Sequence, residues 1–243
     1  MEETKKMIVV PWDCTPVAEN ALAHSAKIAR MVSNDICLLH VVDKDIKLKA
    51  EGEKRTLLNH VAREAGAKYN MNVSAQVVRG TIFTSIAEFV NSNEVNLVVM
   101  GTHGIVGMQK LTGSWALKVI VKSKVPFIVV QNPPADHERY HDIVFPVDFR
   151  IENKEKLSMA IFMGKYFDSK IHILKSNTTD KSLIRKVNIN LNFAIKYLIQ
   201  NNINYEIHEI ERGKFAQRTI DFANKINADL IVIMTTKNIS MAD

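Results

Sequence analysis

The chain has 243 residues, of which 47% are hydrophobic and 24% are charged, and its formal net charge is +6. This length suffices for one large domain or for two domains of ordinary size, each with its own core. The basic residues are spread along the chain and form no stripe with interleaved aromatic residues, so we expect no nucleic-acid partner.

The first apolar run begins at Met7 and ends at Pro11. It is too short for the core of a signal peptide or for a membrane-spanning helix, so we expect no membrane partner. The two cysteines, Cys14 and Cys37, lie far apart in the sequence and form no C-x-x-C pair. These features predict a reducing, cytoplasmic location.

Strand-like and helix-like segments then alternate along the first half of the chain. Apolar runs predict strands, and apolar residues at three- and four-residue spacing predict helices. The first helix has Thr15 at its N-cap position and Pro16 as its first residue. The predicted strands are Met7–Pro11, Asp35–Val42, Val73–Val78, Val95–Val99 and Phe127–Gln131, and the predicted helices are Pro16–Met31, Leu48–Tyr69, Thr81–Asn91 and one that follows Gly113.

A glycine-rich stretch, Met100 to Ala116, connects the fourth strand to the last of these helices. Glycine lets backbone N–H groups approach a ligand, and a helix N-terminus that carries Ser114 adds unpaired donors and partial positive charge. Phosphate is the natural ligand of such a loop. A loop of this composition is also found as a simple tight connection, so composition alone leaves both interpretations open.

The alternation predicts right-handed β-α-β units and a parallel sheet with helices on both faces. A sheet of this kind with the strand order 3-2-1-4-5 has its topological switch point between the first and fourth strands, where ligands bind outside the carboxyl ends. The loops Pro11 to Thr15 and Gly101 to Gly113 lie at this crevice. Position and composition therefore indicate the same site.

The second half of the chain repeats the first half after a linker at residues 133–140. The strand that ends in Pro11-Trp12-Asp13 recurs as one that ends in Pro146-Val147-Asp148. Similar pairs follow at the second strand, at an Arg-Gly step and at the fourth strand. We therefore predict two tandem Rossmann-like, doubly wound α/β domains, at residues 1–132 and 141–243.

The second copy differs from the first where the glycine loop should be. Met234 lies opposite Gly101 and Lys237 opposite Gly104, so we expect its phosphate site to be degenerate. Only 10 residues remain from Met234 onward, against 32 from Gly101 to Asn132 in the first copy. We expect the second sheet to lack its last helix and strand, and we expect a homodimer through exposed sheet edges.

The sequence resembles the universal stress protein A family, of the adenine nucleotide alpha-hydrolase-like superfamily, in its tandem form. The resemblance covers nearly the whole chain and rests on Gly101-Thr-His-Gly104, on Gly113-Ser114 and on Asp13 after the first strand. Eight residues separate Gly104 from Gly113, one fewer than in the family pattern. Asn96 stands where the family usually has Asp.

The resemblance implies a stress-response or signalling switch that binds ATP, with or without Mg²⁺, or AMP or ADP. It implies that Asp13 and the backbone of Val41 face the adenosine, and that the glycine loop and the start of the following helix hold ribose and phosphates. The candidate binding residues are Pro11, Trp12, Asp13, Val41, Met100, Gly101, His103, Gly104, Gly113, Ser114 and Trp115.

Several alternatives stay open at this site. Asp13 can instead cap the first helix or brace its own loop. Trp12 and Trp115 can stack on a base or fill the pocket, and His103 can contact phosphate or face solvent. If the pocket is filled, the alternative function is a nucleotide-free dimeric scaffold.

We expect neither a metal site nor catalytic residues. The cysteines are not paired at metal-binding spacing, and the chain contains no Walker A loop and no Gly-x-Ser-x-Gly turn. Phosphoryl transfer needs positioned cations, and within the glycine loop only Lys110 is available. We expect slow ATP hydrolysis at most.

Overall fold

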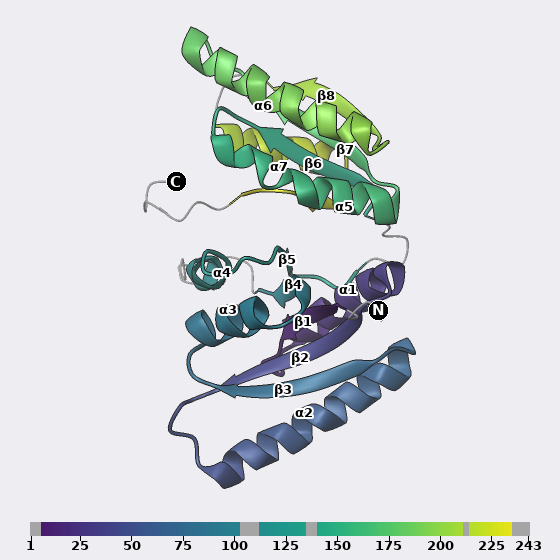
Figure 1. Ribbon diagram of the computed structural model, residues 1–243, viewed down its shortest axis with the longest axis vertical. Helices are drawn as coiled ribbons and strands as arrows, with labels where there is room; N and C mark the ends of the chain where they lie inside the picture. Colours follow the sequence, from purple (N-terminus) through teal and green to yellow (C-terminus); the bar gives the residue numbers. More distant parts are fainter. Residues whose placement is uncertain (1–5, 103–111, 135–139, 211–213, 235–243) are drawn as a thin grey trace. The chain divides into compact units, whose positions relative to one another are not determined.

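The computed structural model describes residues 6–102, 112–134, 140–210 and 214–234, without the side chains of residues 112–115, 152 and 153. The chain divides into two compact units, Met1–Ala135 and Asp136–Asp243. Each unit contains a parallel sheet with helices on its faces (Figure 1). Among the described residues, no helix is long and apolar enough to cross a membrane.

The first unit is a five-stranded sheet with the order β3-β2-β1-β4-β5, in which every pair of neighbours is parallel. This confirms the predicted fold class and strand order. The strands are β1 (Met7–Pro11), β2 (Asp35–Val42), β3 (Val73–Arg79), β4 (Val95–Gly101) and β5 (Phe127–Val130), and the helices are α1 (Pro16–Val32), α2 (Leu48–Tyr69), α3 (Ile82–Ser92) and α4 (Thr112–Ile120).

The predicted ranges agree with these elements, three of them to the residue, and the differences lie at element ends. The fourth strand runs two residues further than predicted, so Gly101 is its last residue rather than the first residue of the loop. The first helix ends where Ser33 adopts a left-handed conformation with φ of 54°. The residues at which helices and strands end depend on local hydrogen bonds, which the spacing of apolar residues does not predict.

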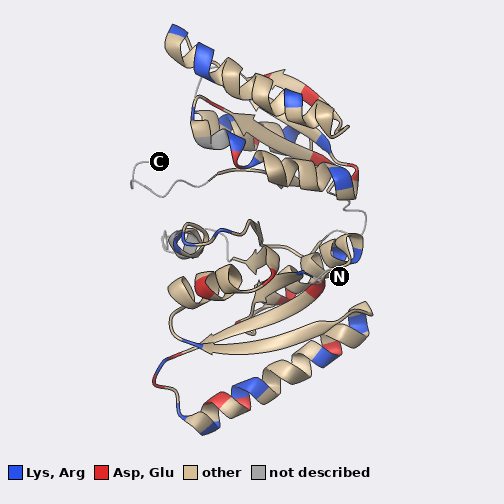
Figure 2. Ribbon diagram, viewed as in Figure 1, with Lys and Arg blue, Asp and Glu red and all other residues tan. Residues whose placement is uncertain are grey.

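Two helices cover each face of the first sheet. On one face, buried side chains of α3 and α4 pack with alternate strand residues such as Val9, Cys37 and Val98. α1 contacts β1 and β4, and α2 lies along β3 (Figure 1). Figure 2 shows that acidic and basic residues are interspersed along α2, and one such pair joins Arg55 to Glu51 at 3.1 Å.

The second unit has a four-stranded parallel sheet with the order β8-β7-β6-β9 among its described residues. This is the order 3-2-1-4 of the first unit, repeated in a shorter sheet. Residues Ala223 and Phe222 pack with Val144 and Leu174 on one face. The elements are β6 (Asp142–Val147), the 3₁₀ turn η1 (Ile151–Lys154), α5 (Leu157–Phe167), β7 (Lys170–Lys175), α6 (Lys181–Gln200), β8 (Tyr205–Glu209), α7 (Phe215–Lys225) and β9 (Leu230–Ile231).

Candidate functional site

The loop between β1 and α1 is joined to β2 by a backbone hydrogen bond and by a hydrogen bond from a side chain of β2. The N–H of Trp12 donates to the carbonyl oxygen of Leu39 at 2.8 Å. Nδ1 of His40 lies 2.6 Å from the carbonyl oxygen of Trp12. Because a carbonyl oxygen only accepts, this contact requires the proton of His40 on Nδ1. His40 therefore holds the start of the loop in place.

Asp13 is exposed and braces the loop that contains it. Its Oδ1 atom accepts hydrogen bonds from the N–H of Thr15 at 3.1 Å and from the Thr15 hydroxyl at 2.6 Å. Thr15 occupies the N-cap position as predicted, but its hydroxyl makes no capping bond. Cys14 between them has a left-handed φ of 63°. The bracing role left open for Asp13 is thus present, and a nucleotide contact by this carboxylate stays a prediction.

The indole of Trp12 is packed inside the first unit, with 4% of the residue exposed. A hollow of about 10 Å³ beside it, the room of a single water molecule, is lined by Cys14, His40 and three residues of α2, Lys54, Leu57 and Leu58. Among the described atoms, the buried indole nitrogen has no hydrogen-bond partner. The ring fills the space between the β1–α1 loop and α2.

Two candidate residues contribute side chains to the core. Val41 pairs with Val78 of β3 and packs against the core under α3 and α4, and Met100 is 9% exposed in the same core. Their side chains are therefore occupied by packing. What they can offer a ligand is backbone N–H or C=O, which agrees with the implied backbone role of Val41.

The carboxyl ends of β1 and β4 are brought together, as the strand order requires. The two strands are parallel neighbours, with Ile8 opposite Leu97 and Val9 opposite Val98. A Cβ atom on Gly101 would overlap the carbonyl oxygen of Val17 in the first turn of α1. Packing of β4 against α1 therefore requires glycine here, whether or not a ligand is present.

The helix after the glycine loop begins at Thr112, so Gly113 and Ser114 lie in its first turn. The backbone N–H groups of a first helical turn have no partner within the helix and are available to an anion. His103, Gly104 and Lys110 lie outside the described residues. The side chains of Ser114 and Trp115 are outside them as well.

The family model of the universal stress protein family matches residues 5–131, more than half of the chain. The chain belongs to the universal stress protein family. Universal stress protein MJ0531 of Methanocaldococcus jannaschii is 29% identical in an alignment of 146 positions that covers 54% of this chain and 85% of the relative. MJ0577 of the same organism is 27% identical in an alignment of 153 positions that covers 52% of this chain and 94% of the relative.

A solved structure extends the likeness in fold beyond the matched half. The crystal structure of a universal stress protein from Archaeoglobus fulgidus is similar over 94% of this chain and 86% of its own chain, with a TM-score of 0.76. The two sequences are 17% identical, so the comparison concerns the fold alone. The fold of each unit is therefore one that a universal stress protein adopts.

In the second copy of the universal stress protein fold, the position of Asp13 is taken by Asp148, which is 6% exposed. The Asp148 carboxylate accepts hydrogen bonds from the Arg150 N–H at 2.9 Å and from its Nε at 2.7 Å. The Asn190 amide donates to the carbonyl oxygens of both residues, at 2.9 and 2.8 Å. The protein's own side chains thus hold this loop and its carboxylate.

Lys156 is a buried cation beside the same loop that sequence patterns did not reveal. It is 7% exposed, its ammonium donates to the Pro146 carbonyl and it lies 4.7 Å from the centre of the Phe145 ring. Burial lowers its pKa to about 8; the attraction of Asp148 opposes this shift, and the repulsion of Arg150 adds to it. A lone lysine in a polar segment gives no sequence signal of burial.

Residues 137–141 read His-Glu-Arg-Tyr-His, which is the H-E-x-x-H spacing of helical zinc sites. That spacing forms a site only on a helix, where the two histidines share one face. Tyr140 has a left-handed φ of 53°, and His141 directly precedes β6. His137 lies outside the described residues. The described end of the segment, Tyr140 and His141, is therefore not helical, as the helical zinc motif would require.

Proposed function

We propose that the first domain binds ATP or a related adenine nucleotide, AMP or ADP, at the carboxyl ends of β1 and β4. The observation that carries the proposal is the meeting of two features at the switch point of the sheet. The braced, exposed carboxylate of Asp13 follows β1, and the glycine loop that follows β4 leads to the start of α4 at Thr112. Membership of a family with nucleotide-binding members supports the same assignment.

In this proposal each side of the crevice has a distinct task. Asp13 and the backbone of Val41 face the adenosine, because a carboxylate and a carbonyl accept hydrogen bonds from an amine or a hydroxyl. The glycine loop and the first turn of α4 hold ribose and phosphates through backbone N–H groups and the Ser114 hydroxyl. Mg²⁺, where it accompanies the nucleotide, offsets phosphate charge. Hydrolysis is slow or absent.

The second domain serves as a partner that does not bind nucleotide. Asp148 is occupied by Arg150 and buried, whereas Asp13 is exposed. Binding in the first domain then acts as a stress-response or signalling switch by changing loop order or assembly. A homodimer through sheet edges fits this role; β5 is one edge of the first sheet, and Val129 on it is 44% exposed.

The test has two steps. Mass spectrometry of the freshly purified protein identifies any nucleotide that remains bound, and calorimetric titration with ATP and Mg²⁺ then gives affinity and stoichiometry. We expect micromolar binding that Gly113→Ala abolishes, because a methyl group would occupy the space of the phosphate. Gly52→Ala is the matched control, since a Cβ at this exposed position of α2 meets nothing within 4 Å.

One observation favours the nucleotide-free scaffold as a second candidate. The Trp12 ring fills its surroundings and leaves a hollow of only about 10 Å³ at the β1–α1 loop. If no nucleotide co-purifies and titration at high protein concentration gives no heat, nucleotide binding is refuted and the scaffold takes its place. Sedimentation velocity then measures whether the protein forms the dimer that the scaffold requires.

A further inference from the structure

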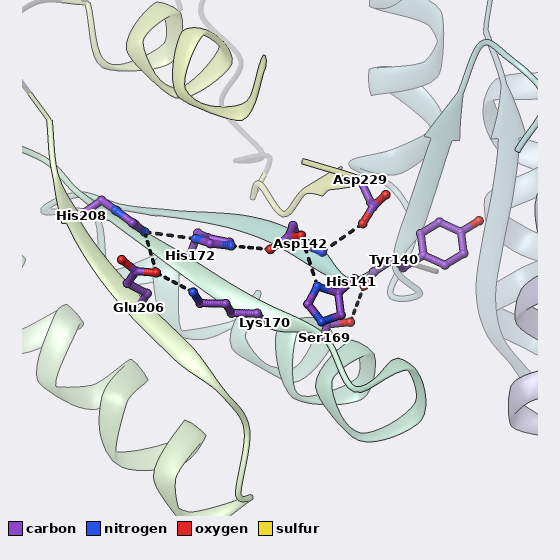
Figure 3. A network of polar contacts seen from close by, with 9 residues as sticks. All are labelled: Tyr140, His141, Asp142, Ser169, Lys170, His172, Glu206, His208 and Asp229. Carbon is purple, nitrogen blue, oxygen red and sulfur yellow. Dashed lines mark hydrogen bonds and ion pairs between the residues drawn. The ribbon is translucent and has the colours of Figure 1, made fainter. Parts of the chain in front are cut away.

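Three side chains with metal-binding atoms meet on one face of the second sheet. His172 lies on β7, and Glu206 and His208 lie on the neighbouring strand β8 (Figure 3). Their ligand atoms all lie within 4.8 Å of one another. The register pairs His172 with Glu206, and the two-residue period of a strand places His208 on the same face as Glu206.

The cluster lies under an apolar side chain of α7. The Phe222 ring is 4.7 Å from the His208 ring and 6.3 Å from the His172 ring, centre to centre. His172 is 6% exposed. Partial exclusion of water strengthens electrostatic interactions with an ion and raises the cost of unpaired polar groups.

A carboxylate on β6 orients the first imidazole. Nε2 of His172 lies 2.7 Å from Oδ1 of Asp142, whose own backbone N–H donates to the Asp229 carboxylate at 2.9 Å (Figure 3). An ionised carboxylate accepts the Nε2 proton, so the lone pair of His172 is on Nδ1. This is the carboxylate–histidine arrangement that typically supports a metal ligand.

The lone pair of His172 points at the second imidazole. Its Nδ1 lies 3.1 Å from Nε2 of His208 and accepts a hydrogen bond from it, so this proton must move to Nδ1 of the His208 ring when an ion binds between the two nitrogens. Two imidazole nitrogens bound to one tetrahedral zinc ion at 2.0–2.1 Å lie about 3.3 Å apart. The pair is therefore already near chelating separation.

Glu206 supplies the third ligand atom and also forms an ion pair with Lys170. Its Oε2 lies 3.9 Å from Nε2 of His208 and 2.6 Å from Nζ of Lys170. Chelation requires the carboxylate to approach His208 by about half an ångström and His172 by up to about 1.5 Å, because zinc–oxygen distances resemble zinc–nitrogen distances. The Lys170 side chain is 38% exposed, so its ammonium can turn to solvent when a cation takes its place.

We propose that His172, His208 and Glu206 bind one divalent transition-metal ion of the zinc type, with Asp142 as a positioning residue for His172. Two imidazoles and a carboxylate suit zinc, cobalt or nickel better than calcium or magnesium. Three protein ligands leave a coordination position for water. The ion joins β7 to β8 within the second domain, whereas the proposed nucleotide site lies in the first domain.

The test titrates the metal-stripped full chain with Zn²⁺ by calorimetry and with Co²⁺ by visible absorption, which reports coordination geometry. We expect one ion per chain and a tetrahedral Co²⁺ spectrum. His208→Ala and Glu206→Gln, both on a strand at the edge of the described sheet, should weaken binding at least tenfold without changing the circular dichroism spectrum. Asp142→Asn should weaken it about 10- to 100-fold, the usual effect of losing such a partner.

Two further variants distinguish metal binding at this site from nonspecific metal binding by other histidines. Lys170→Met should tighten binding, because it removes the cation that competes for Glu206. His60→Ala, which removes an exposed histidine that pairs with Glu64 in the first unit, should leave binding unchanged. The proposal is overturned if wild-type protein binds no Zn²⁺, if His208→Ala binds as well as wild type, or if Lys170→Met weakens binding.

Discussion

Gly101 at the end of β4 and Val17 in the first turn of α1 approach so closely that a Cβ atom on Gly101 would overlap the Val17 carbonyl oxygen. The overlapped atom belongs to the backbone, so no side-chain rotation relieves it. This contact sets the separation of β4 from the β1–α1 loop, and these two segments form the candidate nucleotide crevice. The glycine is thus needed for the scaffold of the site.

Gly101→Ala is therefore expected to destabilise the first domain by about 1–3 kcal/mol, the usual cost of an added atom in a well-packed region. Urea unfolding measured on the transition of the first domain gives the free energy. Gly52→Ala, the same change at an open helical position, should instead stabilise the domain by about 0.5–1 kcal/mol. Equal effects of the two variants would contradict the packing argument.

The elements of the first sheet could be predicted because apolar runs and helical spacing report burial directly, and their order could be predicted because alternating strands and helices commonly adopt it. The predicted ranges of β1, β2 and α2 agree with the structure to the residue, and the other ranges differ at ends that local hydrogen bonding decides. The role of Gly101 could not be predicted, since the Val17 carbonyl approaches it only in the folded sheet. A glycine before a loop gives the same sequence signal whether a helix or a phosphate lies beside it.

The cluster on β7 and β8 escaped prediction for a different reason. Sequence motifs for metal sites describe ligands on one helix or in one loop. Here His172 stands 34 residues before Glu206, and only the register of two parallel strands brings them together. The local signal was Glu206-Ile207-His208, an alternation that places two ligand types on one face of a strand.

The Asn190 side chain connects α6 to the loop that follows β6 by two hydrogen bonds. Replacing Asn190 tests how much these bonds stabilise the second domain. Asn190→Ala leaves the carbonyl oxygens of Asp148 and Arg150 without this buried donor. We expect a loss of about 1–3 kcal/mol in the unfolding free energy of the second domain. Asn192→Ala, at an exposed position of the same helix, should change it by about half a kcal/mol or less.

The buried amine of Lys156 predicts a pH dependence of stability. Its pKa is about 8 in the folded protein and 10.5 ordinarily, so below pH 8 both states are protonated and the cost of burying the charge is fully present. Between these values the unfolded state binds a proton that the folded state does not, and the contribution of this group to stability rises with pH. From pH 7.5 to 10 the gain is about 2 kcal/mol.

The measurement compares urea unfolding of wild type and Lys156→Met at the two pH values. The unfolding free energy of wild type minus that of Lys156→Met should rise by about 2 kcal/mol between pH 7.5 and pH 10. Carbon-13 NMR of labelled lysines should also show one side chain that titrates near pH 8 and is missing from Lys156→Met. Lys186→Met, which removes an exposed lysine of α6, should keep that resonance, and its loss there would reassign the titrating group.

Asp13 allows the structural and the proposed ligand roles of one carboxylate to be separated. In Asp13→Asn the side-chain oxygen still accepts the two hydrogen bonds from Thr15, so we expect the stability of the first domain to be kept. The amide presents N–H groups where the second carboxylate oxygen stood and cannot accept there, so ATP affinity should fall about 10- to 100-fold, as for a lost hydrogen bond to a charged group.

Calorimetric titration with ATP and Mg²⁺ measures this affinity, with Asp221→Asn at an exposed position of α7 as the control. Unchanged affinity in Asp13→Asn would show that the carboxylate only braces the loop, and that the adenosine, if bound, is held by backbone groups alone.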